Sequence, residues 1–176
     1  WAWRQKRIFK IESATNLVLA LLPFEKAFYD KFDVPCKFVG HSLADDIPLE
    51  SDKEAAREKL SLSSPHKVLA LMPGSRGGEL SRLAEPFLRS AEILYKEDPE
   101  LQIIAPMISD KRAGQFKGLL EKYAPTLPVK IIINETQTAI AAADCLLTAS
   151  GTVTLEAALI KRPMVITYRF NPLTYH

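Results

Sequence analysis

The chain has 176 residues, of which 47% are hydrophobic and 25% are charged. This composition excludes an intrinsically disordered chain and predicts a soluble globular protein with a buried core. The formal net charge is only +2, so the overall charge gives no support for nucleic-acid binding.

The first forty residues predict a helix, a strand, a second helix and a second strand. Apolar residues recur at helical spacing over 4–15, and the continuous apolar run 17–22 is interpreted as a buried strand. Pro23 suits the first turn of a helix, and residues 36–39 form another strand-like stretch. We therefore interpret residues 1–40 as the last βα units of a parallel-sheet domain.

Basic residues gather at the amino end of the chain. The first ten positions contain four of them and no acid: Arg4, Lys6, Arg7 and Lys10. They fit either a solvated helix face or a surface that attracts anionic lipid headgroups. The run 17–22 is too short to cross a bilayer, which needs about 20 apolar residues. The chain shows no secretory signal, and its lack of an initial Met predicts a fragment.

The two cysteines, Cys36 and Cys145, lie in apolar, strand-like stretches. Neither is near another Cys or His at the spacing of metal ligands. We expect both to be reduced core residues, which suits a cytosolic compartment.

Residues 41–65 form the predicted interdomain linker, because they are polar, contain prolines and lack a sheet-like run. Good helix formers between 52 and 60 predict a short exposed helix. The acidic pair Asp45 and Asp46 is interpreted as a solvated turn. His41, a lone histidine at a domain edge, is interpreted as a structural residue.

Residues 66–176 predict a second, doubly wound α/β domain. Apolar runs predict strands at 67–72, 101–106, 129–133, 144–148 and 163–167. Between them, residues 79–96 and 110–123 carry apolar stripes at helical spacing. Near-continuous apolar strands are typical of a parallel sheet that is covered by helices on both faces.

The turn after the first of these strands has the features of a phosphate site. Gly74, Gly77 and Gly78 lie at the start of a helix, where backbone N–H groups and about half a positive charge favour an anion. Arg76 adds a full charge and a planar fork that suits phosphate oxygens. The spacing matches neither the dinucleotide fingerprint nor a Walker loop. A plain glycine-rich turn with a solvent-facing Arg76 is the alternative.

A second strand-to-helix turn contains Ser150, Gly151 and Thr152, with Glu156 one helical turn later. Ser150 or Thr152 could cap the helix, but no Glu or Gln completes a capping box. Glu156 can accept hydrogen bonds from the vicinal hydroxyls of a ribose, or it can answer the helix dipole. Together the two turns indicate a nucleotide-sugar domain.

Four segments closely resemble the lipid-A-disaccharide synthase family, GT-B glycosyltransferases of family 19. They are residues 71–79, residues 149–156, Trp1-Ala2-Trp3-Arg4 and Leu22-Pro23-Phe24-Glu25. The resemblance runs through essentially the whole chain and implies two Rossmann-like domains. Residues 1–40 would end the acceptor-binding domain, and residues 66–176 would form most of the UDP-sugar-binding domain.

The resemblance also implies a reaction and its site residues. UDP-2,3-diacylglucosamine and 2,3-diacylglucosamine 1-phosphate (lipid X) would give lipid A disaccharide 1-phosphate and UDP. The implied UDP-binding residues are Gly74, Ser75, Arg76, Ser150, Gly151, Thr152 and Glu156. Arg76 would be catalytic, because a fixed cation stabilises the charge that grows on the leaving β-phosphate. No general base is expected in this chain, and neither a metal nor another cofactor is expected.

The implied partners are the donor and acceptor lipids and the surface of a membrane. The resemblance places a cytoplasmic protein peripherally on the cytoplasmic face of the bacterial inner membrane. Trp1 and Trp3, beside the basic helix, favour such contact. No nucleic acid is expected as a partner, and a homodimer remains open.

Two other functions compete with this hypothesis. An enzyme similar to UDP-N-acetylglucosamine 2-epimerase would share the fold and the nucleotide but would isomerise a soluble sugar. A non-catalytic nucleotide-binding or response-regulator-like domain would need acidic strand ends to hold a divalent cation. The strand ends at 72–73, 106–107 and 148–149 are not acidic.

Overall fold

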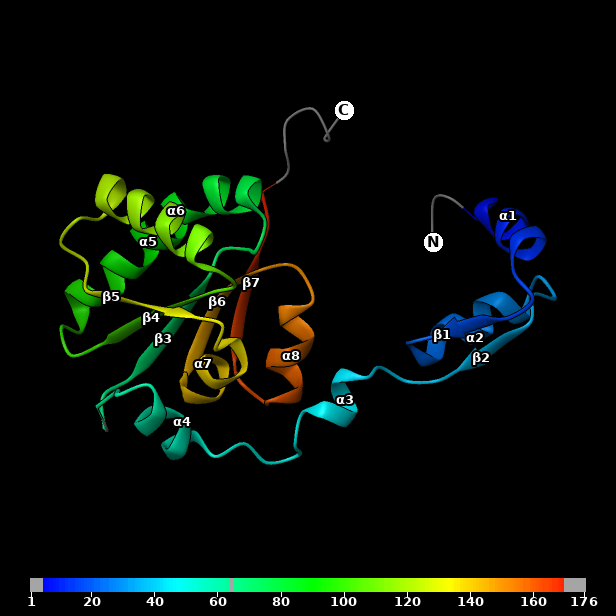
Figure 1. Ribbon diagram of the computed structural model, residues 1–176, viewed down its shortest axis with the longest axis horizontal. Coiled ribbons are helices and arrows are strands. Elements are labelled where there is room, and N and C mark those ends of the chain that lie inside the picture. Colours follow the sequence, from blue (N-terminus) through cyan, green and yellow to red (C-terminus); the bar gives the residue numbers. More distant parts are fainter. Residues whose placement is uncertain (1–4, 64, 170–176) are drawn as a thin grey trace. The chain divides into compact units, whose positions relative to one another are not determined.

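The computed structural model describes residues 5–63 and 65–169. The chain divides into two compact units, Trp1–Pro48 and Leu49–His176, so the boundary falls within the segment 41–65. Figure 1 labels the elements of both units. Three residues of the predicted membrane-facing surface lie outside the described residues: Trp1, Trp3 and Arg4.

The first unit contains a two-stranded parallel sheet and short helices. Its elements are α1 (Arg7–Ala14), β1 (Val18–Ala20), α2 (Pro23–Asp30), β2 (Cys36–Phe38) and α3 (Leu43–Asp46). Val18 of β1 pairs with Cys36 of β2, and a small core forms around Ile8, Tyr29 and Val34. The predicted order of helix, strand, helix and strand is confirmed.

The interpretation of residues 17–22 as a buried strand is wrong. Only Val18–Ala20 form β1, and only Ala20 is buried. Four leucines of the run are exposed: Leu17, Leu19, Leu21 and Leu22. The carboxylate of Glu25 accepts hydrogen bonds from the backbone N–H groups of Leu21 and Leu22, at 3.2 and 3.0 Å. These bonds turn the chain into α2 and end the strand early.

The second unit is built on a parallel sheet with the strand order β5-β4-β3-β6-β7. Its strands are β3 (Val68–Met72), β4 (Gln102–Met107), β5 (Val129–Ile133), β6 (Cys145–Ala149) and β7 (Met164–Thr167). All neighbouring strands are parallel. The five predicted strands are confirmed. Cys36 and Cys145, in β2 and β6, are free and partly buried.

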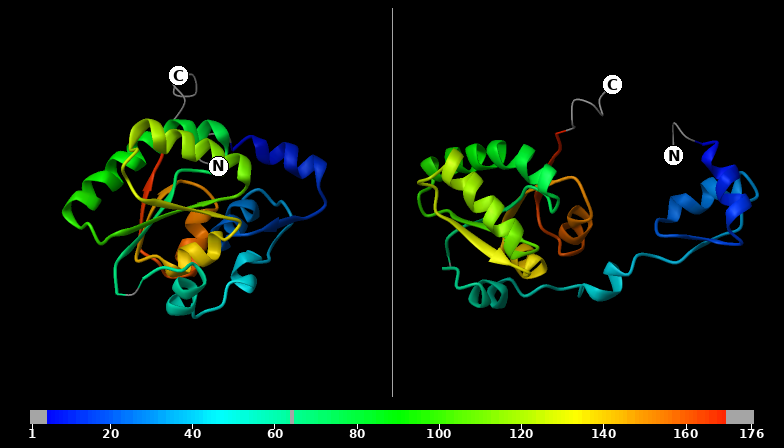
Figure 2. Two further views of the ribbon diagram at one scale, coloured as in Figure 1. Left: turned by 60° about the vertical axis from the view of Figure 1, so that its left-hand side comes forward. Right: turned by 45° about the horizontal axis from the view of Figure 1, so that its top comes forward.

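Helices cover both faces of this sheet, as predicted. The helices of the second unit are α4 (Lys53–Lys59), α5 (Gly77–Glu97), α6 (Asp110–Tyr123), α7 (Thr136–Ala142) and α8 (Val153–Leu159). Figures 1 and 2 show α5 and α6 on one face and α7 and α8 on the other. Buried Phe87 of α5 and Phe116 of α6 pack with Leu71 and Ile103 of the sheet. No helix of the described residues is long and apolar enough to cross a membrane.

Helix α4 forms where a short exposed helix was predicted, but one of its faces is buried. Ala56, Arg57 and Leu60 are buried, and α4 packs against α7. Arg57 donates from Nε to the carbonyl of Ala142 at 3.1 Å and from Nη2 to Asp144 Oδ2 at 2.7 Å. The carboxylate of Asp144, just before β6, therefore holds this charged helix against the domain.

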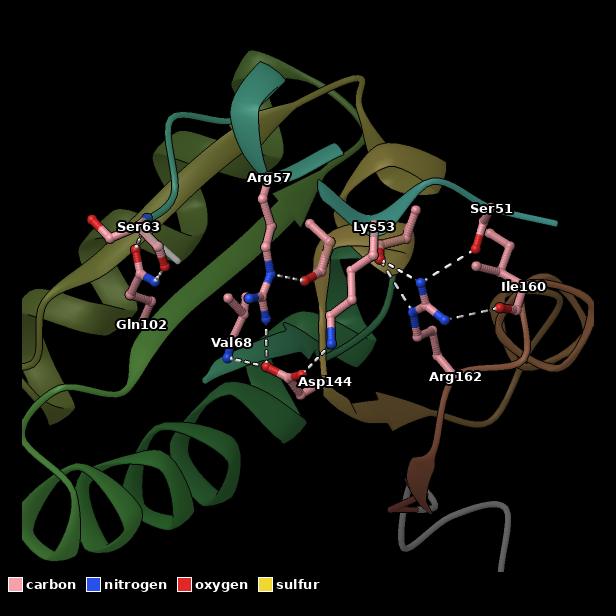
Figure 3. A network of polar contacts seen from close by, with 11 residues as sticks. Ser51, Lys53, Arg57, Ser63, Val68, Gln102, Asp144, Ile160 and Arg162 are labelled. Carbon is pink, nitrogen blue, oxygen red and sulfur yellow. Dashed lines mark hydrogen bonds and ion pairs between the residues drawn. The ribbon is translucent and has the colours of Figure 1, made fainter. Parts of the chain in front are cut away.

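Asp144 is the centre of a polar network at the amino ends of β3 and β6 (Figure 3). Its carboxylate also accepts from Lys53 Nζ and, at 2.7 Å, from the backbone N–H of Val68. Burial opposes its ionisation, but these hydrogen bonds and the charges of Lys53 and Arg57 hold its pKa below the usual value. We call Lys53, Arg57, Asp144 and Arg162 the amino-edge network.

Arg162 lies just before β7 and binds the end of α7. Its Nε and Nη2 donate to the carbonyl of Ala141 at 3.1 and 2.8 Å, and Nη2 also donates to Ser51 Oγ at 3.2 Å. The neighbouring Lys161 donates to the carbonyl of Leu49 at 2.5 Å. Hydrogen bonds and ion pairs therefore hold residues 49–57, the first of the second unit, against the rest of that unit.

Candidate functional site

The two predicted turns leave the sheet side by side. β3 pairs with β6, and Met72 at the end of β3 lies beside Thr148 of β6. From β3 the chain crosses to β4 on one side, whereas β6 lies on the other side. The strand order therefore reverses between β3 and β6. In an open parallel sheet, the crevice outside the carboxyl ends at such a point is where ligands bind.

A cavity of about 490 Å³ lies at this place. All seven residues that were predicted to bind UDP line it: Gly74, Ser75, Arg76, Ser150, Gly151, Thr152 and Glu156. The tertiary structure thus brings the glycine turn and Glu156 to one cavity. Sequence reasoning missed Glu79, Arg112 and Thr136, which also line the cavity.

The glycine turn is shaped by Gly74 and Glu79. Gly74 has φ +110°, a conformation that side chains of L-residues rarely adopt. A Cβ on Gly74 would lie 2.8 Å from Cβ of Glu79 and 2.9 Å from its Oε2. Glu79, in the first turn of α5, therefore packs into the space that the glycine leaves. Both the backbone angle and this contact require glycine at position 74.

Arg76 precedes α5 and lies at the mouth of the cavity. Its side chain is 84% exposed, and Nη1 donates to Glu79 Oε1 at 3.0 Å. The Glu79 side chain is only 14% exposed. A partly buried carboxylate thus pairs with a largely exposed cation beside the start of a long helix, where the backbone N–H groups also favour anions.

The second turn leads into α8. Thr152 precedes this helix, and its side chain makes no capping hydrogen bond. Thr154 Oγ1 donates to the carbonyl of Gly151 at 2.7 Å, and the N–H of Ser150 donates to Thr167 at 3.2 Å. Among the described residues, the side chains of Ser150 and Thr152 are therefore not used as helix caps, which was the alternative to a binding role.

Glu156 lies in the first turn of α8 and is partly buried. Burial raises its pKa, because the charged carboxylate loses water. Within residues 5–63 and 65–169, no hydrogen bond or ion pair reaches its side chain. Its carboxylate is therefore an acceptor that a ligand can use.

Glu156 also borders a second cavity, of about 390 Å³. Ile108, Thr136 and Glu156 are common to the linings of both cavities. The rest of the second cavity is formed by residues 134–138, where β5 leads into the first turn of α7. A ligand with an anionic part at Gly74 and hydroxyls at Glu156 can thus extend a further group toward the start of α7.

Other sequence candidates lie in the first unit. His41 accepts a hydrogen bond at Nδ1 from the N–H of Leu43 at 3.2 Å, which is a structural role. Asp45 and Asp46 are exposed in α3, as expected for a solvated turn. The described part of the chain has no group of three or more His, Cys, Asp and Glu residues arranged to hold a metal ion.

The chain is similar in sequence to proteins of one description. The family model described as lipid-A-disaccharide synthetase matches residues 1–176. Lipid-A-disaccharide synthase of Colwellia psychrerythraea is 67% identical over 175 residues, which cover 99% of this chain and 44% of that protein. The proteins of this description from Pseudoalteromonas translucida and Vibrio vulnificus are 54% identical, over 99% of this chain and 46% of their own length. The chain thus spans less than half of the length of these curated relatives.

Solved structures share the fold. The chain aligns with UDP-GlcNAc 2-epimerase from Neisseria meningitidis, bound to UDP-GlcNAc, with a TM-score of 0.62 and 14% identity over 88% of this chain and 45% of that one. The pneumococcal O-GlcNAc transferase in complex with UDP and GlcNAc gives 0.53 and 15%, over 98% and 35%. Identities this low establish the fold alone. The α/β fold of GT-B type with parallel sheets is confirmed.

Proposed function

The chain belongs to the lipid-A-disaccharide synthase family, and from this premise we propose that the whole protein is a glycosyltransferase of lipid A biosynthesis. It condenses UDP-2,3-diacylglucosamine with 2,3-diacylglucosamine 1-phosphate and releases UDP. The product is the β-1,6-linked lipid A disaccharide 1-phosphate. The observation that carries the proposal is that both motif turns of the family resemblance border one cavity at the switch point of the sheet.

In this proposal the donor lies along the cavity with its diphosphate at the glycine turn. The positive φ of Gly74 shapes the turn before α5, and the backbone N–H groups at the start of this helix favour phosphate oxygens. Residues 150–152 lie beside the diphosphate, and the ribose hydroxyls donate to Glu156. The uracil ring then extends into the second cavity, against Ile108 and residues 134–138 at the start of α7.

Arg76 is the catalytic residue that the chain contributes. When the bond between the sugar and the β-phosphate breaks, negative charge grows on the departing UDP. A guanidinium that is already tethered beside that position, through Glu79, lowers the barrier without reorganisation during the reaction. We assign the general base that accepts the proton of the acceptor hydroxyl to a part of the protein outside this chain.

Contact with the membrane is proposed for the first unit. Lys6, Arg7 and Lys10 are exposed, and Phe9 between them is exposed as well. Cations together with an aromatic ring favour the surface of an anionic bilayer. This arrangement supports peripheral association with the cytoplasmic face of the inner membrane, where both acylated substrates would be delivered. A homodimer is compatible with the proposal but has no specific support.

The likeness to a 2-epimerase does not favour epimerisation, because it concerns the fold alone. The two reactions are separated by their need for an acceptor. A transferase releases UDP only when the monosaccharide lipid acceptor is present, whereas an epimerase converts its UDP-sugar without one.

The test is an assay of UDP release by the full-length protein, with UDP-2,3-diacylglucosamine as donor. We expect release that depends on 2,3-diacylglucosamine 1-phosphate, formation of a disaccharide in equal amount, and the same rate in EDTA. Isomerisation of UDP-N-acetylglucosamine without acceptor would establish the epimerase instead. Loss of UDP binding in EDTA would show that the assumption of a metal-free site is wrong.

A further inference from the structure

Arg112 lines the same cavity as Arg76 but belongs to a different helix. It lies in the first turn of α6, whose capping residue Ser109 accepts a hydrogen bond from the backbone N–H of Arg112 at 3.4 Å. Since α6 follows β4 and β4 pairs with β3, the first turn of α6 lies near the first turn of α5. The two helices also pack against each other.

The guanidinium of Arg112 is held in place by Gln115. Arg112 Nη1 donates to Gln115 Oε1 at 2.7 Å. The amide nitrogen of Gln115 donates in turn to the carbonyl of Gly77 and to Ser81 Oγ, both at 2.9 Å. Gln115, a neutral residue, therefore connects the arginine to the first turn of α5.

Gly77 explains why the guanidinium can lie there. A Cβ added at Gly77 would be 2.6 Å from Arg112 Nη1 and 3.2 Å from its Cζ. Gly77 has no positive φ, so its backbone conformation alone does not require glycine. The absence of a side chain at Gly77 instead leaves the space that the guanidinium occupies.

Arg112 and Arg76 differ in their charge balance. Arg76 forms an ion pair with Glu79. In the part of the chain that the structure describes, no ion pair reaches Arg112, and its hydrogen bond to Gln115 uses one of five N–H donors. An arginine with an uncompensated charge and free donors at a cavity wall is suited to bind an anion.

We propose that Arg112 is a second cation of the diphosphate site, positioned by Gln115 and admitted by Gly77. This inference rests on the proposed function, because it takes the diphosphate of UDP as the anion at the glycine turn. Gly77 belongs to that turn, and the guanidinium lies against it. An anion bound at the glycine turn therefore lies close to the guanidinium of Arg112. Arg112 binds the diphosphate of the UDP-sugar, while Arg76 stabilises the charge that develops on the leaving UDP.

The experiment measures Kd for UDP and for uridine with the full-length protein in the absence of acceptor. Arg112→Ala should weaken the binding of UDP about 10- to 100-fold, as expected for lost charge-assisted hydrogen bonds, and should change uridine binding by less than about twofold. Arg112→Lys should recover part of the affinity, because it restores the charge but not the fork. Lys111→Ala is the matched control, since Lys111 is the exposed neighbour and does not line the cavity.

Gly77→Ala tests the geometry without removing the arginine. The added Cβ meets the far end of a flexible side chain, so the fold should persist while the guanidinium moves. We expect UDP binding to weaken, and we expect the double variant Gly77→Ala/Arg112→Ala to bind UDP as Arg112→Ala does. Additive losses in the double variant would contradict the assigned contact between the two residues.

The outcomes separate this inference from the proposed function. If the unaltered protein prefers UDP to uridine and Arg112→Ala binds UDP equally well, Arg112 has no role at the diphosphate, while the proposed function stands. An effect of Arg112→Ala confined to the KM of the acceptor would likewise overturn the inference and assign the residue to the phosphate of the acceptor. If the unaltered protein does not bind UDP, the proposed function itself is wrong.

Discussion

Arginines lie at both the amino ends and the carboxyl ends of the strands in the five-stranded sheet, but their side chains have different partners. At the amino ends of the strands, Arg57 and Arg162 donate to carbonyl and carboxylate oxygens of the protein itself. At the carboxyl ends, Arg76 is largely exposed and Arg112 has a single neutral side-chain partner among the described residues.

This difference separates a structural from a functional use of the same residue type. An arginine whose donors are satisfied inside the protein stabilises the fold, and the loss of its partner leaves a buried charge unpaired. An arginine with free donors at a cavity contributes little to stability, because water solvates it in the absence of a ligand. The amino-edge network should therefore control unfolding, and the cavity residues should control binding and turnover.

The largest expected effect is on catalysis. Arg76→Ala should lower turnover about 100- to 1000-fold, as for other preorganised groups that stabilise a leaving charge, with little change in Tm because the side chain is exposed. Arg89→Ala is the matched control, since Arg89 forms a similar pair with Glu92 on the same helix. Steady-state kinetics and thermal unfolding of both variants measure the contrast. A Tm loss without a loss of turnover would reverse the assignment of Arg76.

The next effect is on stability. Asp144→Asn should lower the free energy of unfolding by about 2–3 kcal/mol, because it leaves the buried Arg57 without its carboxylate. The partial exposure of Asp144 keeps the loss below that of a fully buried pair. UDP affinity of the folded variant should stay the same. Urea unfolding and calorimetric titration test both statements, and a change in UDP affinity would show that the two edges are coupled.

The pH dependence of this difference has a definite sign. Folding lowers the pKa of Asp144, so its contribution is complete above the ordinary pKa of an aspartate and is lost as pH falls through the lowered pKa. The gap in unfolding free energy between the native sequence and Asp144→Asn should therefore shrink in acid. A gap that is independent of pH would mean that the charge of Asp144 is not what stabilises the edge.

A smaller effect is expected at Glu156. Glu156→Gln should weaken UDP binding about tenfold, because the amide accepts less well from ribose hydroxyls than a carboxylate does. Burial raises the pKa of Glu156. As pH falls, the native protein should therefore lose its tighter binding at a higher pH than a protein with an exposed glutamate would. The Kd of uridine should be measured as a function of pH for the native protein and for Glu156→Gln. The ratio of the two values isolates the contact with the ribose, because uridine carries no phosphate. Equal affinity of the native protein for UDP and pyrophosphate would contradict the ribose assignment.

The same burial should make Glu156→Gln more stable than the native sequence in the absence of ligand. A raised pKa means that the folded state holds the proton more tightly, so native stability falls as pH rises through the window above the ordinary value. The difference in Tm should therefore appear at neutral pH and vanish in acid. A variant that is less stable at neutral pH would indicate a hidden partner for the carboxylate.

The smallest effect is expected at Lys59, which links α4 to Glu135 in the wall of the second cavity. Lys59 Nζ donates to Glu135 Oε2 at 2.7 Å, and its hydrogen bond lowers the pKa of Glu135. Because the pair is exposed, Lys59→Met should change UDP affinity by less than about twofold. A larger change in Kd would mean that the linker helix positions the wall of the nucleotide site.

Much of the fold was predictable because it depends on local pattern. The five strands of the second unit and the helices over 79–96 and 110–123 follow from runs and periods of apolar residues. The errors arose where a polar side chain outside the segment decides. Helix α4 is polar, and only Asp144, far along the chain, explains why Arg57 is buried. Leu21 and Leu22 are apolar, but the carboxylate of Glu25 takes their N–H groups out of the strand.

The sequence by itself determined the chemistry of the two turns, because the glycines, Arg76 and Glu156 are each recognisable from their immediate neighbours. Only the tertiary structure decided that β3 and β6 are adjacent, since strand order depends on how helices cross over the sheet rather than on local composition. The pairing of β4 with β3 likewise brings Arg112 to Gly77, although the two residues are 35 positions apart in the sequence, roughly the length of one βα unit. The proposed phosphate turn can thus be found from its own residues, but the second cation that we propose for it depends on the order of the strands.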